Sequence, residues 1–198
     1  MSTERLLQIA SPPLSASSPA REACPDTQLG EHLWKMLSRR NGFYALESAL
    51  HVYPAADSRH PPLAWLNPYE NLTAGLHFFG EDIFGNQFVL CGDGVPLFDA
   101  ETGEIEEVAR SLEEWAERLL SDDYWTGWSL AHQWQMQNGP LEPGHRLLPK
   151  LPFVLGGQFT AENLYSVAAA EGMNYRAGIA LQIRGVPDGT DITLPTSP

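Results

Sequence analysis

The sequence has few positive charges, few cysteines and no long apolar run. Twelve Lys and Arg residues stand against 25 Asp and Glu residues, which gives a formal net charge of −13 at pH 7. Because a phosphate backbone attracts the opposite sign of charge, nucleic acid is not an expected partner. The apolar stretches are far shorter than the ~20 residues that a membrane span requires. We therefore expect no membrane partner either.

The cysteines and the start of the chain indicate the compartment. Cys24 and Cys91 lie far apart and form no C-x-x-C pair, which favours a reducing environment. The apolar stretch Leu6–Ala10 is interrupted by Gln8 and ends before Pro12. It is too short for the apolar region of a secretory signal. These features predict a cytoplasmic protein.

The residues that usually carry chemistry form no catalytic or metal-binding pattern. Gly127–Ala131 comes nearest to the G-x-S-x-G turn of serine hydrolases, but it ends in alanine and no buried strand precedes it. The six histidines include no H-E-x-x-H pair. Asp99, Glu101 and Glu104 lack the glycine position and the final glutamate of a calcium loop. We expect no enzyme, no metal site and no cofactor.

The composition predicts one folded domain behind a flexible tail. The 198 residues are 43% hydrophobic and 19% charged, and the mean hydropathy of −0.24 is typical of a soluble chain with one core. Residues 11–25 are dominated by Ser, Pro and Ala, which cannot offset the entropy lost on ordering. We expect residues 1–27 to be a flexible tail and residues 28–198 to form the domain.

The spacing of apolar residues predicts several helices. A 3.6-residue pattern indicates helices over Leu29–Leu37, Phe43–Val52 and Glu171–Arg184. The capping box Ser111–Glu114 begins another helix, and the aromatic-rich segment Tyr124–Gln137 is expected to be helical in its second half. The apolar stripe that should face the core after the capping box consists of Leu112, Trp115, Ala116 and Leu119.

Short aromatic and aliphatic runs separated by glycines predict a sheet. These runs are Leu76–Phe79, Gln87–Cys91, Val95–Phe98 and Glu104–Ala109. The connectors Gly92–Gly94 and Asp99–Gly103 carry glycine where a hairpin turn needs positive φ, which predicts an antiparallel meander. Phe153–Leu155 is expected to be a buried strand, Asn163–Ala169 a strand or a loop, and Ile192–Leu194 a last short strand. The fold class is therefore α+β, with a mostly antiparallel sheet packed against several helices.

The negative charge is concentrated in one part of the chain. Residues 60–123 contain fourteen acidic and two basic residues, and so carry twelve of the thirteen net charges. A solvated surface that keeps the protein soluble is one explanation. Concentration in one sheet-and-helix unit instead favours a negative field that attracts a basic partner. The residues expected to bind that partner are Glu104, Glu106, Glu107, Glu113, Glu114, Glu117, Asp122 and Asp123.

Four segments carry a recognisable pattern: Asn41–Val52, Phe79–Phe88, Phe98–Glu104 and Leu112–Trp115. Together they resemble the SUKH superfamily, which includes bacterial immunity proteins and fungal cell-wall-synthesis regulators. The most specific elements are the turn with Asp82, Phe84, Gly85 and Asn86, the hairpin Asp99–Gly103 and the tryptophan helix that follows it. The resemblance implies an α+β fold with helices on an antiparallel sheet and without catalytic residues.

The resemblance also implies a function. Bacterial members of this superfamily bind and neutralise a cognate toxin, often a nuclease, in the cytoplasm of the cell that produces it. A nuclease must present a basic cleft to its substrate, so an acidic surface suits its inhibitor. The chain is therefore predicted to be an immunity protein. The alternative is a non-enzymatic regulatory scaffold or adaptor of the same fold.

Overall fold

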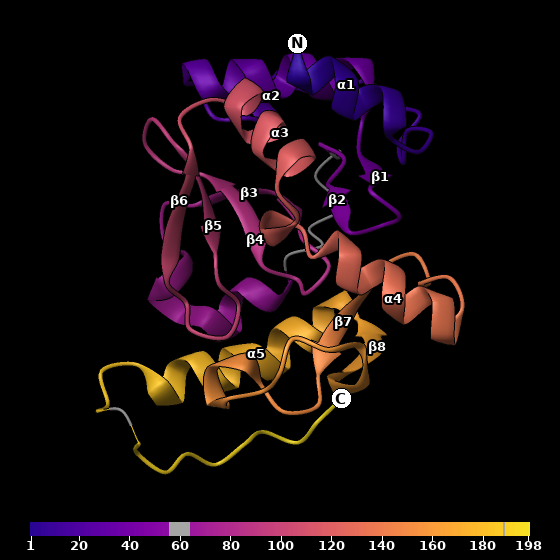
Figure 1. The fold of residues 1–198 in the computed structure, drawn as a ribbon. Helices are drawn as coiled ribbons and strands as arrows, with labels where there is room; N and C mark the ends of the chain where they lie inside the picture. Colours follow the sequence, from indigo (N-terminus) through magenta and orange to yellow (C-terminus); the bar gives the residue numbers. More distant parts are fainter. Residues whose placement is uncertain (56–63, 188) are drawn as a thin grey trace.

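The centre of the molecule is an antiparallel sheet in which each strand pairs with the next one along the chain. The computed structural model describes residues 1–55, 64–187 and 189–198. Within these residues the sheet has six strands in the order β1-β2-β3-β4-β5-β6 (Figure 1). Their bounds are β1 Phe43–Ala45, β2 Leu50–Val52, β3 His77–Glu81, β4 Gln87–Leu90, β5 Val95–Phe98 and β6 Ile105–Ala109. The predicted meander is confirmed.

Helices cover both faces of this sheet, which makes the α+β fold a single compact domain. Helices α1 (Ser2–Ile9), α2 (Gln28–Arg39) and α3 (Leu112–Ser121) lie on one side, and α5 (Ala169–Ile183) lies on the other (Figure 1). Neighbouring residues of one strand therefore enter different cores: Phe79 packs with the first group and Phe78 with α5. Coverage of both faces explains why β4 and β5 are buried at every position.

The remaining elements extend the α5 side of the domain. Helix α4 (Trp128–Asn138) follows α3, and a second antiparallel pair, β7 (His145–Pro149) with β8 (Leu164–Ala168), precedes α5. The short 3-10 turns are η1 Arg21–Ala23, η2 Ala64–Thr73, η3 Asp123–Trp125, η4 Phe153–Leu155 and η5 Ala161–Asn163. Within the described residues, no helix combines the length and apolar character needed to cross a membrane.

Helix α3 begins and packs as its sequence predicts. The Ser111 hydroxyl accepts a hydrogen bond from the Glu114 backbone N–H at 3.1 Å. The Glu114 carboxylate reaches back to the backbone N–H of Arg110 rather than to that of Ser111. Every residue of the predicted apolar stripe is buried. The predicted helices at α2, α4 and α5 are also present.

The helix predicted over Phe43–Val52 is wrong, because this segment is the hairpin of β1 and β2. Phe43 pairs with Val52, and Ala45 with Leu50, so the buried residues alternate with a period of two. The turn places Leu46, Glu47 and Ser48 at positive φ without any glycine, which is rare for such residues. The apolar residues of so short a run fit both the 3.6-residue period of a helix and the two-residue period of a strand.

Two predicted strands outside the meander are also absent. Phe153–Leu155 forms the 3-10 turn η4 between Pro152 and a left-handed Gly156, and none of its residues is buried. Ile192–Leu194 is extended but pairs with no strand, because Thr193 donates its backbone N–H to the side chain of Gln182 on α5. Asn163–Ala169, which could be a strand or a loop, forms β8 over Leu164–Ala168.

The segment expected to be a flexible tail is part of the fold. Residues 2–9 form α1, whose Leu6 and Leu7 are buried in the core beneath α2 and α3. The chain then runs beside β1, where the backbone N–H groups of Ser11 and Leu14 donate to the carbonyl oxygens of Tyr44 and Gly42 at 2.7 and 2.9 Å. The prediction of a flexible tail from composition is wrong, because the two buried leucines of a short helix attach the segment to the core.

Shortening Leu6 should therefore destabilise the whole domain. We expect Leu6→Ala to lower the free energy of unfolding by about 2–3 kcal/mol, because a fully buried leucine loses its transfer free energy and leaves a cavity. The measurement is urea denaturation followed by circular dichroism. Ile9→Ala is the matched control, since Ile9 lies on the same helix and is 53% exposed. Equal unfolding midpoints for the two variants would show that α1 is not docked in solution.

Candidate functional site

The turn between β3 and β4 forms the floor of a cleft. One oxygen of the buried Asp82 carboxylate accepts hydrogen bonds from the backbone N–H groups of Phe84 and Asn86, and the other accepts one from the Asn86 side-chain amide, each at 2.8 Å. Gly85 has φ +84°, and a Cβ there would lie 3.0 Å from the guanidinium of Arg176. The residues that carried the family resemblance are thus the ones that build this turn.

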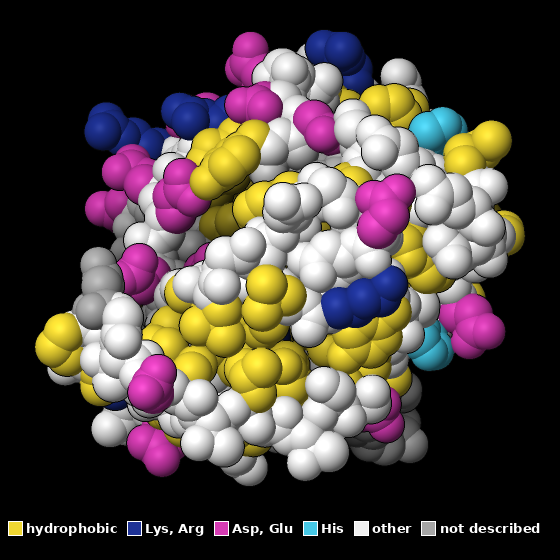
Figure 2. Space-filling view, turned by 60° about the horizontal axis from the view of Figure 1, so that its bottom comes forward, with side chains coloured by type: hydrophobic (Ala, Val, Ile, Leu, Met, Phe, Trp, Pro, Cys, Tyr) yellow, Lys and Arg dark blue, Asp and Glu magenta, His cyan; other side chains and the backbone are white. Residues whose placement is uncertain are grey.

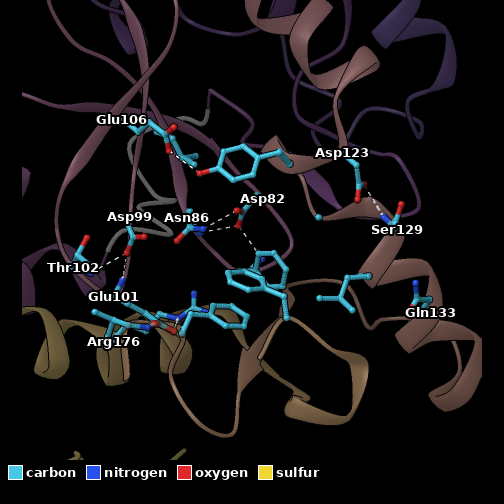
Figure 3. Close-up of a pocket in the computed structure, with 18 residues that line it drawn as sticks. Asp82, Asn86, Asp99, Glu101, Thr102, Glu106, Asp123, Ser129, Gln133 and Arg176 are labelled. Atoms are coloured by element: carbon cyan, nitrogen blue, oxygen red, sulfur yellow. Dashed lines mark hydrogen bonds and ion pairs between the residues drawn. The ribbon is translucent and has the colours of Figure 1, made fainter. Parts of the chain in front are cut away.

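The hairpin between β5 and β6 is joined to that turn. Asp99 accepts hydrogen bonds from the backbone N–H groups of Glu101 and Thr102 at 2.7 and 2.9 Å. The side-chain oxygen of Asn86 accepts the backbone N–H of Ala100 at 3.1 Å. Asp82, Asn86 and Asp99 therefore fix two turns into one block (Figure 3). Within the described residues no group of acidic, histidine or cysteine side chains is arranged to hold a metal ion.

A buried ion pair attaches α5 and η4 to this block. Glu101 is buried, and one carboxylate oxygen lies 3.8 Å from the Nε of Arg176 on α5. The other oxygen accepts the backbone N–H of Val154 in η4 at 2.9 Å. Burial raises the pKa of Glu101, and the positive charge of Arg176 counteracts part of that rise. The pair connects the two sides of the cleft rather than facing solvent.

The cleft lies between this block, β6, the start of α4 and the loop around η4. Its volume is about 600 Å³, within the range of small-ligand sites. An aromatic wall closes one side: Phe153 and Phe159 stack at 3.9 Å between ring centroids with their planes 6° apart, and Phe84 meets Phe153 edge-on. Figure 2 shows hydrophobic side chains gathered on this side of the molecule, with acidic side chains grouped beside them.

Charge in the cleft is predominantly negative. Among the described residues that line it, Arg176 supplies the one guanidinium, and five residues supply carboxylates: Asp82, Asp99, Glu101, Glu106 and Asp123. Burial raises the pKa of Asp82 to about 7, although the hydrogen bonds from Asn86 and the charge of Arg176 act in the opposite direction. Asp82 is therefore only partly ionised at neutral pH. The exposed carboxylates of Glu106 and Asp123 carry charge at the rim.

The structure places two of the eight acidic residues expected to bind a partner in this cleft. Glu106 accepts a hydrogen bond from the hydroxyl of Tyr124 at 3.2 Å, and Asp123 accepts one from the backbone N–H of Ser129 at 2.8 Å (Figure 3). Asp123 thus holds the first turn of α4. Among the hydrogen bonds of the described residues, none links the Ser129 hydroxyl to a histidine, and Gly127 caps α4 rather than following a strand.

Three others are exposed but do not line this cleft. Glu104 and Glu107 are exposed on either side of Glu106, and Glu107 forms an ion pair with Arg110 at 3.4 Å. Asp122 accepts the backbone N–H of Tyr124 at 3.0 Å and so begins η3. These residues add to the negative field beside the cleft without lining it.

The three acidic residues of α3 have different roles. Glu113 accepts hydrogen bonds from the backbone N–H groups of Ser2 and Thr3, which fixes the start of α1. Glu114 is bound to Arg118 at 3.0 Å and to the Arg110 backbone, whereas Glu117 remains exposed. The eight residues therefore do not form one continuous surface.

The cleft contains residues that the sequence did not single out as a binding site. Arg176 lies in a predicted helix, but the sequence pattern of that helix does not indicate that the Arg176 side chain points toward Glu101. Phe153 was expected in a strand, and Phe159 had no predicted role. Asp82 and Asp99 were recognised as turn residues only. The one signal in the sequence for Arg176 is that no other basic residue lies within α5.

A second buried charged group lies on the other side of the β3–β4 turn and has a structural role. The carboxylate of Glu81 lies 2.9 Å from the Nδ1 of His51 and 2.9 Å from the Nε of Arg146 on β7. Gln87 donates to its other oxygen at 3.2 Å, and the ring of Tyr44 stacks on His51 at 4.3 Å. Glu81, Gln87 and Arg146 are buried, and Tyr44 and His51 are partly buried. The group ties β7 to the central sheet.

The comparisons with known proteins support the fold alone. No protein-family model matches the chain, and neither does any curated protein. A solved structure from Agrobacterium tumefaciens, that of Atu4351, is similar over 88% of this chain and 87% of its own, with a TM-score of 0.59 and 16% sequence identity. At this identity the likeness extends to the arrangement of helices and strands and not to the site.

Proposed function

We propose that this protein is a non-catalytic immunity protein, which acts in the cytoplasm by binding a toxin domain and neutralising it. The observation that carries the proposal is the cleft, where an acidic rim formed by Glu106 and Asp123 borders an aromatic wall. In the part of the chain that the structure describes, the one guanidinium that lines the cleft belongs to Arg176, and it already faces Glu101. A basic protein surface is the partner that this arrangement complements.

The chemistry of a nuclease explains why an acidic inhibitor would work. A nuclease binds phosphates through a basic cleft. A negative protein surface is attracted to the same cleft and competes with the phosphates for it. Aromatic side chains supply much of the binding energy at protein interfaces. Tyr124 is 67% exposed and Phe159 is 66% exposed, and both line the cleft. The site thus combines long-range attraction with contact area.

The decisive experiment is rescue of a cell from the toxin. The probe is the product of the gene adjacent to the one that encodes this chain, expressed alone and together with the full chain. We expect growth arrest without this protein and normal growth with it, and a complex that co-elutes in gel filtration. Stable binding of several unrelated proteins without any rescue would instead establish the regulatory scaffold.

Association of the two proteins should depend steeply on salt. Between 0.01 M and physiological ionic strength the screening length falls from about 30 Å to about 8 Å, so attraction by the acidic rim weakens. We expect the double variant Glu106→Lys and Asp123→Lys to reduce the association rate constant about tenfold or more at low salt, with a smaller change in dissociation. Stopped-flow fluorescence across a salt series measures both rates.

Glu142→Lys is the matched control for this charge reversal, because Glu142 is exposed and does not line the cleft. Far-ultraviolet circular dichroism and thermal melting of both variants check the fold, because Asp123→Lys also removes the acceptor of the Ser129 backbone N–H. If the double variant and the control associate at the same rate at low salt, the acidic rim does not steer the partner.

A further inference from the structure

The stacked rings of Phe153 and Phe159 are only partly covered by the rest of the fold. Phe84 packs against both rings, with centroids 5.3 and 6.0 Å away, but Phe159 remains 66% exposed. Both rings line the cleft, and they stack in parallel at 3.9 Å between centroids. The face of an exposed aromatic ring attracts a cation through its quadrupole, and a planar guanidinium can also stack on it.

The carboxylates around the aromatic wall define the charge of the occupant. Glu106 and Asp123 are exposed at the rim, and Asp99 lies deeper beside the two turns (Figure 3). The hydrogen bonds that these three accept come from neutral N–H and O–H groups, so their negative charges face no paired cation in the described structure. An anionic ligand would be repelled here, whereas a cation is stabilised.

The floor adds a donor that fits the backbone of an inserted chain. Arg176 is buried, and its Nε–H has no hydrogen-bond acceptor within the described residues, although Glu101 lies 3.8 Å away. A buried donor of this kind is stabilised by a carbonyl oxygen. The cleft thus offers acceptors at its rim and a donor at its floor.

We propose that the cleft is a socket for an arginine side chain, presented by an extended segment of the bound toxin. This proposal rests on the proposed function and names how the partner is recognised. The guanidinium lies against the exposed ring of Phe159, and the carboxylates of Glu106 and Asp123 at the rim supply the opposite charge. Lysine fits less well, because a compact, strongly hydrated ammonium neither stacks nor forms a fork of hydrogen bonds.

The volume determines how much of the segment enters. At about 600 Å³ the cleft exceeds the size of one side chain, so the residues that flank the arginine enter with it. Their backbone carbonyls come within reach of Arg176, and the amide side chain of Gln133, which also lines the cleft, supplies a further donor. An extended peptide with a central arginine is therefore the smallest adequate probe.

The first test uses that peptide with the full chain. A blocked tripeptide Gly-Arg-Gly is titrated into the isotope-labelled protein, and the amide signals of residues 153–159 and Asp123 are followed by nuclear magnetic resonance. Two control peptides replace the arginine. Citrulline keeps the planar shape of the side chain but has no charge, and lysine keeps the charge but has no planar group. We expect the arginine peptide to bind about tenfold more tightly than either.

The second test separates the cleft from the acidic surface as a whole. Glu106→Gln and Asp123→Asn remove charge while keeping acceptors for Tyr124 and Ser129, and Phe159→Ala removes the aromatic face. We expect each to weaken peptide binding about tenfold, whereas the control Glu142→Gln leaves it unchanged. Thermal melting shows that the variants are folded. Equal binding of the arginine and citrulline peptides would overturn the socket. So would changes in the amide signals that are confined to residues outside the cleft.

The outcomes for the two proposals are distinguishable. If the arginine peptide binds in the cleft but the chain gives no rescue from the toxin, the immunity function fails and the socket stands. If the chain rescues the cell equally well with Phe159→Ala, Glu106→Gln and Asp123→Asn combined, the function stands and the socket is refuted. Loss of rescue in that triple variant, with the fold intact, supports both.

Discussion

Replacing Glu81 by alanine should lower the free energy of unfolding by about 3–5 kcal/mol. The carboxylate is buried between His51 and Arg146, at 2.9 Å from each. Removing it leaves the guanidinium of Arg146 buried without its counter-charge, and breaking a buried pair from one side is strongly destabilising. The same change frees β7 from the central sheet, because Arg146 lies on that strand. Urea denaturation at pH 7 measures the loss.

The same group should make the fold sensitive to acid. Burial alone would raise the pKa of Glu81, but the charge of Arg146 and the hydrogen bond from His51 outweigh it, so the pKa falls to about 2. Burial lowers the pKa of His51, which favours its neutral form and an Nδ1–H that donates to Glu81. Both features hold the carboxylate ionised and hydrogen-bonded in the folded state.

The direction of the pH effect follows from the lowered pKa. In the unfolded chain the Glu81 pKa is near 4.5, so the stabilisation is complete above that value and is lost as the pH falls toward 2. The contribution is on the order of 3 kcal/mol. We expect Glu81→Gln to flatten the dependence of stability on pH between about 5 and 2. Glu117→Gln is the control, since Glu117 is exposed on α3. An unchanged slope in Glu81→Gln would contradict the assignment.

The sheet could be predicted from sequence because its turns are marked by residues with a specific backbone requirement. Gly92 and Gly103 both have positive φ and end runs of aromatic and aliphatic residues. The β1–β2 hairpin carries no such mark, since Leu46, Glu47 and Ser48 take positive φ without glycine. Sequence patterns report what a residue prefers, and tertiary packing can override that preference.

The candidate site could be predicted only in part, because the sequence gives the number of charged residues and not where their side chains point in the fold. Glu113 and Glu106 both belong to the acidic segment, yet one fixes the start of α1 and the other borders the cleft. The contact between Asn86 and Ala100 joins two turns that were predicted separately. Arg176 reaches Glu101 only because α5 packs across the sheet. Such contacts between distant segments are set by packing.

Trp115 should be as important for stability as Glu81, through apolar packing rather than charge. Its side chain is fully buried, and its ring meets Phe79 and Phe88 edge-on, with centroids 5.2 and 5.5 Å apart. These contacts hold α3 against the central sheet. Replacing a buried tryptophan by alanine costs about 3–5 kcal/mol, a large part of the stability of a typical domain.

Two substitutions separate the loss of volume from the loss of the indole N–H. Within the described residues the Trp115 Nε1–H has no hydrogen-bond acceptor, so phenylalanine removes an unpaired donor along with part of the ring. We expect Trp115→Phe to cost less than half as much as Trp115→Ala. Trp128→Ala is the control on α4, where the side chain is partly exposed. Urea denaturation with near-ultraviolet circular dichroism measures all three. If Trp115→Ala unfolds at the same urea concentration as the control, α3 does not pack on the sheet through this residue.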